Sequence, residues 1–467
     1  MKKIPVKLGV AATRRNVFSS TEAVNFKNRI LRDLRENDVE VVDLEWLNEE
    51  GLLYQTADVP AVQARFLHEG VDALFIPHCN FGCEAAVCQL SRALGVPVLL
   101  WGPRDDAPQP DGLRLRDSQC GLFATSAVLR NMGVPFTYLE NSWIDHPEWL
   151  EGVKRFLCTA LTVKRFRHLR IGQVDTRPGD FWSVMCNEAE LLRRFGIETV
   201  PLTLVDIRDE INRLLTDSRS LLENQMQQIR HRFRCDFPDN SLEKLAALKI
   251  TLAEWAQRDN LSAIAVQCWN AMQSLLGIMP CAVNAMLTDE GLPVVCETDI
   301  CGAVSAVLAQ AAAGDTEPVF FADVTVRHPS NDNAELLWHC GNFPPSLRRE
   351  GEPAVISSHY TLPDACPGVC EWELRHDTVT ILRFGGSNGR YSLLAAKGNG
   401  VDGPKSRGTY LWTEFADWPA LERRLIYGPY IHHVAGIYGD IIPIIKEALR
   451  YMPGVEDDIV HGCTGGA

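Results

Sequence analysis

Residues 291–303 read GLPVVCETDICGA, and this stretch decides how the chain is interpreted. The apolar run that ends at Cys296 is typical of a buried strand, and the small apolar residues from Ile300 onward are typical of a helix. Asp299 stands where a helix N-cap is expected, because its carboxylate can accept a hydrogen bond from a free N–H group of the first turn. Glu297 has no such role. It is predicted to lie at the carboxyl end of a strand, which is where ligands bind in open α/β sheets.

The alternation of strands and helices extends outward from this stretch in both directions. Short apolar runs such as VKLGVAA, VDALFIPHC and VPVLLWGP alternate with amphipathic segments up to about residue 167, and the pattern begins again near residue 168. This predicts two α/β domains with parallel sheets, residues 1–167 and 168–315. From about residue 316 to 467, short β-rich runs such as PVFFADVTV are separated by turn residues, which predicts a mostly antiparallel barrel or sandwich.

Two glycine-rich motifs in the last region match catalytic patterns without their structural context. Residues 385–389, GGSNG, fit the nucleophile elbow, but strand-like sequence lies on both sides and predicts a hairpin. Residues 398–403, GNGVDG, fit a dinucleotide-binding loop, but Pro404 follows where a helix would have to begin. We interpret both motifs as turn glycines.

Composition excludes several classes of function. The formal charge of −14 leaves no general attraction for nucleic acid or anionic lipid. No run approaches the roughly 20 apolar residues that cross a bilayer. Lys7 and the pair Arg14 and Arg15 interrupt the first apolar run before a secretory core could form. Fifteen cysteines lie mostly singly in apolar segments, as in a reducing compartment. We therefore expect a cytoplasmic protein with no nucleic-acid or membrane partner.

Two carboxylates and several imidazoles form a candidate metal-binding set. Asp323 lies inside the apolar run PVFFADVTV, His339 in LLWHCGN, and His432 and His433 near the C-terminus. Each of them, like Glu297, could be a satisfied polar residue of the core. Taken together they are a mixed oxygen and nitrogen set, which suits Mn²⁺, Mg²⁺ or Co²⁺ better than a thiolate-preferring metal. Spacing alone leaves both interpretations open.

At these residues the sequence resembles the L-fucose and L-arabinose isomerases. The resemblance is carried by AIAVQCWNAMQSLLGIMPCAVNAMLTDEGLPVVCETDICGAV, then ADVTV, LLWHCGN and HHVAGIYGD in this order. It implies two Rossmann-like or flavodoxin-like α/β domains followed by a β-barrel-like C-terminal domain. It also implies a Mn²⁺-dependent aldose–ketose isomerase.

The resemblance also implies roles for individual residues. Glu297 and Asp323 match the two carboxylates that bind the metal and catalyse the reaction, and His433 matches the histidine ligand. His339 corresponds to a further histidine ligand of the arabinose enzymes. His432 stands where the fucose enzymes carry asparagine, and is expected to contact the sugar.

In the family, a neighbouring subunit's first domain completes the site. The segment ATRRNVF resembles the arginine-bearing stretch used there, which makes Arg14 and Arg15 candidates for sugar contacts. The segment PHCNFGCEAA resembles a second such stretch and adds Asn80, Phe81 and Glu84. A homo-oligomer, a trimer or hexamer, with its active site at the subunit interface is therefore expected.

Aldose–ketose isomerisation explains the residue types independently of the family. Moving a carbonyl between C1 and C2 of an open-chain sugar transfers one proton through a cis-enediolate, whose charge a divalent cation stabilises. Two carboxylates can serve as base and acid. A non-catalytic sugar-binding or sensing protein on the same scaffold is one alternative, and a metal-dependent lyase or epimerase is another. The sugar stays open among pentoses, 6-deoxyhexoses and sugars with an anionic C6 group, as does the choice of initial base.

Overall fold

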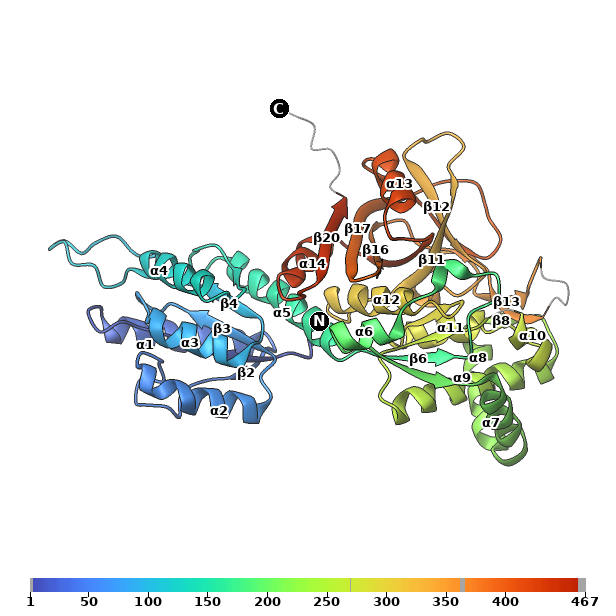
Figure 1. Ribbon diagram of the computed structural model, residues 1–467, viewed down its shortest axis with the longest axis horizontal. Helices are drawn as coiled ribbons and strands as arrows, with labels where there is room; N and C mark the ends of the chain where they lie inside the picture. Colours follow the sequence, from blue (N-terminus) through green and yellow to red (C-terminus); the bar gives the residue numbers. More distant parts are fainter. Residues whose placement is uncertain (1–2, 269, 362–365, 461–467) are drawn as a thin grey trace. The chain divides into compact units, whose positions relative to one another are not determined.

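The computed structural model describes residues 3–268, 270–361 and 366–460. Its internal contacts divide the chain into two compact units. Unit 1 extends to Lys164 and includes Glu447–Pro453, and unit 2 comprises Arg165–Lys446 and the residues from Gly454 onward. Figure 1 shows the elements of both units in sequence colours. The domain boundaries near residues 167 and 315 stay predictions.

Unit 1 contains a parallel sheet with helices packed on it. Its strands are β1 (Lys7–Val10), β2 (Glu40–Val42), β3 (Ala73–Pro77), β4 (Val98–Trp101) and β5 (Thr137–Tyr138), in the order β2-β1-β3-β4-β5. This is the order of flavodoxin-like sheets. Its helices are α1 (Ser20–Glu36), α2 (Val59–Glu69), α3 (Glu84–Leu94), α4 (Ser118–Asn131) and α5 (Pro147–Arg167), which ends in unit 2. Buried residues of α1 such as Ile30, Leu31 and Leu34 follow the helical period.

Unit 2 contains a second parallel sheet, in the order β10-β9-β6-β7. Its strands are β6 (Arg170–Val174), β7 (Glu198–Leu202), β9 (Ala263–Val266) and β10 (Val294–Cys296). The accompanying helices are α6 (Glu188–Phe195), α7 (Leu204–Asp217), α8 (Arg219–Arg232), α9 (Asp239–Arg258), α10 (Ala271–Leu276), α11 (Cys281–Asp289) and α12 (Ile300–Ala312). The prediction of an α/β protein with parallel sheets is confirmed.

A large mixed sheet follows in the same unit. Its strands are β11 (Phe320–Arg327), β12 (Ala334–His339), β15 (Trp372–Glu373), β16 (Thr378–Ser387), β17 (Arg390–Val401), β18 (Thr409–Phe415), β19 (His433–Tyr438) and β20 (Val455–Val460). Six of them, β18-β12-β11-β19-β16-β17, are antiparallel neighbours, and β17 pairs again with β18, so the pairings form a closed circuit. β20, which carries Glu456, Asp457 and Asp458, is added outside the circuit in parallel with β17. In the sequence, helix α13 (Trp418–Tyr427) follows β18 and helix α14 (Ile442–Leu449) follows β19.

Helix α12 connects the two sheets of unit 2. Each of its residues from Ile300 to Ala312 is buried. It contacts β6, β9 and β10 of the parallel sheet as well as β11, β16 and β19 of the mixed sheet, and Figure 1 shows it between them. Alanine and glycine permit this close approach: a Cβ on Gly302 would lie 2.6 Å from the Phe321 ring. The N-terminus of α12 is therefore fixed inside the protein.

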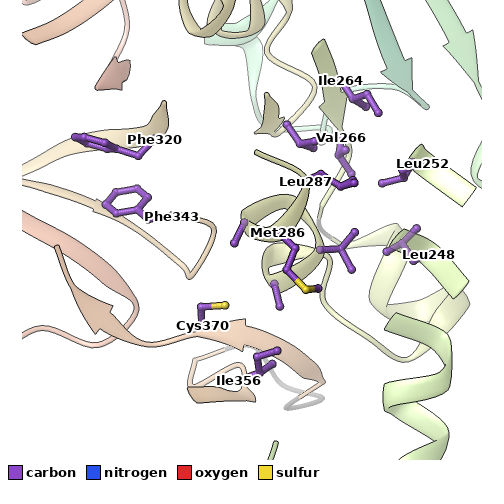
Figure 2. Close-up of a cluster of buried hydrophobic side chains, with 14 of the residues drawn as sticks. Leu248, Leu252, Ile264, Val266, Met286, Leu287, Phe320, Phe343, Ile356 and Cys370 are labelled. Carbon is purple, nitrogen blue, oxygen red and sulfur yellow. The ribbon is translucent and has the colours of Figure 1, made fainter. Parts of the chain in front are cut away.

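The main apolar core of unit 2 lies among these layers. Figure 2 shows Phe320 and Phe343 side by side, with ring centroids 5.0 Å apart, and Val266, Met286 and Leu287 across the core. A small sheet of β8 (Arg234–Cys235), β13 (Val355–Ser358) and β14 (Pro367–Cys370) closes one side of it. Three single turns of 3₁₀ helix, η1 (Thr56–Asp58), η2 (Trp182–Val184) and η3 (Pro345–Leu347), complete the elements.

The two glycine-rich motifs have different outcomes. β16 and β17 form a hairpin joined by Asn388 and Gly389, so the hairpin prediction is confirmed, although Gly385 and Gly386 lie within β16 rather than in the turn. The interpretation of residues 398–403 as turn glycines is wrong for Gly398 and Gly400, which lie within β17. A Cβ on Gly398 would lie 2.6 Å from the Thr413 side chain, and one on Gly400 would lie 2.8 Å from the His376 backbone. Glycine is needed here because neighbouring chain segments approach closely.

Within the described ranges, no helix combines the length and apolar character needed to cross a membrane.

A buried carboxylate in β12 provides a test of the fold. Glu335 is buried, and burial together with the charge of Glu422 raises its pKa to about 7, although Arg327 opposes the shift. As the pH rises from 4.5 to 7, the unfolded chain loses this proton before the native one does, so the free energy of unfolding falls.

We expect Glu335→Gln to raise the free energy of unfolding at pH 8 by about 1–3 kcal/mol and to change it little at pH 4.5. Urea denaturation at the two pH values measures this. Glu414→Gln, an exposed position on the neighbouring β18, is the matched control. An equal effect of Glu335→Gln at both pH values would contradict the assignment of a buried, protonated side chain.

Candidate active site

The candidate site begins where β10 ends and α12 begins. Glu297 and Thr298 connect them, both in the left-handed backbone region with φ of 62° and 55°. The Thr298 N–H donates to the Val266 carbonyl at 3.2 Å, and the Asp299 carboxylate accepts from the Gly302 N–H at 2.8 Å. The predicted strand, N-cap and helix are thus confirmed. This short, strained turn holds the buried Glu297 at the carboxyl edge of the parallel sheet.

Two strands of the mixed sheet bring the other ligand types to the same place. Asp323 of β11 and His433 of β19 are directly paired residues in adjacent antiparallel strands. Side chains of directly paired residues point to the same face of a sheet. The Val324 N–H donates to the His432 carbonyl at 2.8 Å, so the pairing continues past the end of β19. Residues more than 100 positions apart therefore meet because of strand register.

The distances within the site fit a shared cation. His433 Nε2 lies 2.9 Å from Glu297 Oε2 and 3.4 Å from Asp323 Oδ1. His432 Nε2 lies 3.9 Å from Asp323 Oδ1. Ligand atoms of Glu297, His432 and His433 all lie within 4.8 Å of one another. Oxygen and imidazole donors converging at such separations can hold a divalent metal ion.

The opposite side of His433 faces a buried ion pair. His433 Nδ1 lies 2.8 Å from Asp299 Oδ2, and Arg383 of β16 contacts both oxygens of the same carboxylate, at 2.5 and 3.1 Å. Burial opposes the charge on Asp299, but Arg383 and His433 outweigh it and hold its pKa below the usual range. Burial lowers the pKa of His433, yet its hydrogen bonds to Asp299 and Glu297 and the charge of Asp323 raise it to about 9. Without a cation, the proton on His433 offsets the charge of the carboxylates.

His339 lies close to this centre without joining the cluster of three. Its Nδ1 accepts the Cys340 N–H at 2.9 Å, and its Nε2 is buried without a hydrogen-bond partner among the described residues. Burial lowers the pKa of His339, but the charge of Asp323 and the contact with Cys340 raise it to about 9. The prediction that His339 is a metal ligand stays a prediction.

The candidate sugar contacts of unit 1 lie together at the carboxyl ends of β1 and β3. The Arg15 N–H donates to Asn80 Oδ1 at 2.8 Å, the Arg15 guanidinium forms an ion pair with Glu84, and it lies 4.0 Å from the Phe81 ring centroid. Arg14 pairs with Glu50 at 2.5 Å and lies over the Tyr54 ring. Both arginines are therefore compensated by carboxylates within unit 1.

Sequence reasoning missed the roles of Arg383, Asp299, Glu50 and Tyr54. Arg383 was not selected, although a charged residue inside the apolar run TVTILRF was a visible signal of a buried ionic partner. Asp299 was selected only as a helix cap, whereas its carboxylate also bonds to His433 and Arg383. Glu50 and Tyr54, the partners of Arg14, gave no signal in the sequence.

Comparison with known proteins identifies chains that are similar to this one. Residues 9–167 match the family described as the N-terminal domain of fucose/sulfoquinovose isomerase. A sulfoquinovose isomerase of Alkalicoccus urumqiensis is 29% identical over 380 residues, covering 80% of this chain and 82% of that protein. One of Priestia megaterium is 27% identical over 386 residues, covering 82% and 84%. A periplasmic solute-binding protein from Actinobacillus succinogenes with bound D-allose reaches a TM-score of only 0.17 at 10% identity over 66% of this chain and 92% of that chain, which is too low to carry an argument.

The strained turn before α12 can be tested through Thr298. A β-branched residue is disfavoured at φ of 55°, whereas asparagine is well tolerated there and has a similar volume. We expect Thr298→Asn to raise the free energy of unfolding by about 0.5–1 kcal/mol, as measured by urea denaturation. Thr316→Asn, at an exposed position without a positive φ, should change it less. A clear loss of stability in Thr298→Asn would mean that the hydrogen bond from Thr298 Oγ1 to the Thr176 carbonyl, 3.3 Å, outweighs the strain at this residue.

Proposed function

Because the chain belongs to a fucose isomerase-like family, we propose that it is a metal-dependent aldose–ketose isomerase acting on an open-chain monosaccharide. The observation that carries this proposal is the convergence of Glu297, Asp323 and His433 from β10, β11 and β19 onto one small volume. A pair of carboxylates beside an imidazole suits metal-assisted proton transfer between adjacent sugar carbons.

We propose Mn²⁺ as the cation, with Mg²⁺ or Co²⁺ as substitutes. Glu297, Asp323 and His433 would hold it, and His432 and His339 are close enough to contribute to its surroundings. The residues fit a hard divalent ion because Asp323 Oδ1 is buried without a hydrogen-bond partner among the described residues and faces an imidazole nitrogen. When bound, such an ion polarises the oxygens on C1 and C2 of the sugar and makes the hydrogen on the carbon more acidic.

The carboxylates then carry the proton. One of them, Glu297 or Asp323, takes the proton from C2 of the aldose, and the C2–H electron pair forms the double bond of a cis-enediolate while the carbonyl electrons move to O1. The same proton is returned to C1, the hydroxyl proton of O2 passes to O1, and the ketose carbonyl forms at C2. Neither electrons nor water are consumed. General acid–base catalysis of this kind contributes about 10²–10⁴-fold.

The relatives direct the choice of substrate. They are named as sulfoquinovose isomerases, so we propose a sugar with an anionic C6 group as the first candidate, ahead of pentoses and 6-deoxyhexoses. We further propose a homo-oligomer, a trimer or hexamer, in which Arg14, Arg15, Asn80, Phe81 and Glu84 of a neighbouring subunit contact the sugar. The family resemblance and the clustering of these side chains support this part of the proposal.

The activity can be tested directly. We expect the purified protein with Mn²⁺ to convert sulfoquinovose to its ketose, and EDTA to abolish the conversion until Mn²⁺ is restored. A panel with L-fucose, L-arabinose and D-glucose, followed by chromatography, measures specificity. A product with fewer carbons would instead indicate a lyase, and saturable sugar binding without turnover would indicate a sensing protein.

Neutral variants of the two carboxylates test their role in catalysis. We expect Glu297→Gln and Asp323→Asn each to lower kcat at least 10²-fold, because neither amide can accept the proton. Glu373→Gln is the matched control, since Glu373 also contacts a histidine, His376, at 2.9 Å but lies outside the site. Steady-state kinetics measure the effect. Retention of more than a tenth of kcat in both site variants would contradict the assignment.

A further inference from the structure

The imidazole of His433 has a defined orientation because both of its nitrogens are engaged. Nδ1 lies 2.8 Å from Asp299 Oδ2, and Nε2 faces Glu297 and Asp323. A carboxylate can only accept a hydrogen bond, so Nδ1 carries a hydrogen toward Asp299, and a cation that binds between Glu297 and Asp323 replaces the hydrogen that Nε2 carries toward Glu297. The lone pair of the neutral imidazole is then on Nε2, directed between the two site carboxylates. A metal ion can be bound only by that lone pair.

Both carboxylate oxygens of Asp299 accept hydrogen bonds from other parts of unit 2. Oδ1 accepts the Gly302 N–H at 2.8 Å and lies 3.1 Å from Arg383 Nη2, while Oδ2 lies 2.5 Å from Arg383 Nη1. The side chains of Asp299, Arg383 and His433 are all almost completely inaccessible to solvent. The carboxylate therefore cannot rotate away from His433 without breaking contacts to the helix and to β16.

Capping α12 does not require this arrangement. A serine or asparagine would cap the helix equally well with one oxygen and no charge. A buried ion pair also costs several kcal/mol of desolvation per ion, so it contributes little to stability compared with apolar packing. The additional bonds to His433 and Arg383 point to a function in the neighbouring site.

We propose that Asp299 and Arg383 are positioning residues of the metal site: Asp299 orients the His433 ring so that it binds through Nε2, and Arg383 holds the Asp299 carboxylate in place. Carboxylates that orient metal-binding histidines typically contribute 10–100-fold to metal affinity. This inference rests on the proposed function, because it needs a metal bound at Glu297, Asp323 and His433.

The test compares Mn²⁺ binding in variants that keep the fold but change the partner of His433. The double variant Asp299→Asn/Arg383→Gln removes both charges together. The asparagine oxygen can still accept the Gly302 N–H and so cap the helix. The asparagine amide then donates to His433 Nδ1, which places the ring hydrogen on Nε2. We expect the Mn²⁺ dissociation constant, measured by calorimetry and by electron paramagnetic resonance, to rise at least 10-fold. Asp299→Ser/Arg383→Met, which retains a capping hydroxyl, should show a similar rise.

Two further variants separate positioning from a structural role. Arg383→Lys retains a positive charge beside Asp299, although lysine cannot bond to both carboxylate oxygens as the guanidinium does. This variant should bind Mn²⁺ within about threefold of the parent protein. Cys186→Ser alters a side chain close to Asp299 and Arg383 that has no bond to His433, and should leave Mn²⁺ affinity unchanged. Circular dichroism and thermal unfolding verify the fold of each variant.

The outcomes are distinguishable. Folded double variants that bind Mn²⁺ within twofold of the parent would overturn the positioning role and leave the proposed function intact. Failure of both double variants to fold would assign the ion pair to the structure rather than to the site, and would also overturn it. Absence of saturable Mn²⁺ binding by the parent protein would instead contradict the proposed function.

Discussion

The burial of helix α12 on all sides is the constraint on which the site depends. A helix N-terminus has free N–H groups and a partial positive charge that water normally stabilises. Here the helix lies between two sheets, so a side chain must supply that stabilisation inside the protein. Asp299 does so, and the charge that it brings must be balanced there. Arg383 and His433 do so from two strands of the mixed sheet. The buried charge of Asp299 thus connects the parallel sheet, the helix and the mixed sheet at a single point.

The candidate site lies next to the Asp299 ion pair, and the two share His433. Glu297 stands two residues before Asp299, and His433 contacts both carboxylates through its two ring nitrogens. The parallel sheet contributes the edge at which ligands commonly bind, and the antiparallel pair β11 and β19 contributes Asp323 and His433 in register. A site built on strands and a helix start is more rigid than one built on loops. This rigidity suits a reaction that moves a proton over one carbon–carbon bond.

Much of the local structure could be predicted from the sequence. The strand that ends at Cys296, the cap at Asp299 and the strand containing Asp323 follow from hydrophobic periodicity and capping chemistry, which act over a few residues. Arg383 could not be assigned in this way, because its partner lies 84 positions away and the contact depends on how two sheets pack on one helix. The strand glycines Gly398 and Gly400 were misread for the same reason. Glycine is needed at both positions because chain segments that are distant in the sequence approach them closely in the folded protein.

The closed circuit of strand pairing also affects how copies of the protein behave beside one another. Six strands of the mixed sheet satisfy their backbone groups within the ring, so few are left open to pairing with another chain. β20 is added to this ring as an outer strand, and it carries three consecutive acidic residues, Glu456, Asp457 and Asp458. An exposed strand with like charges repels the same strand of another molecule. The acidic residues of β20 therefore disfavour pairing of this edge with another chain.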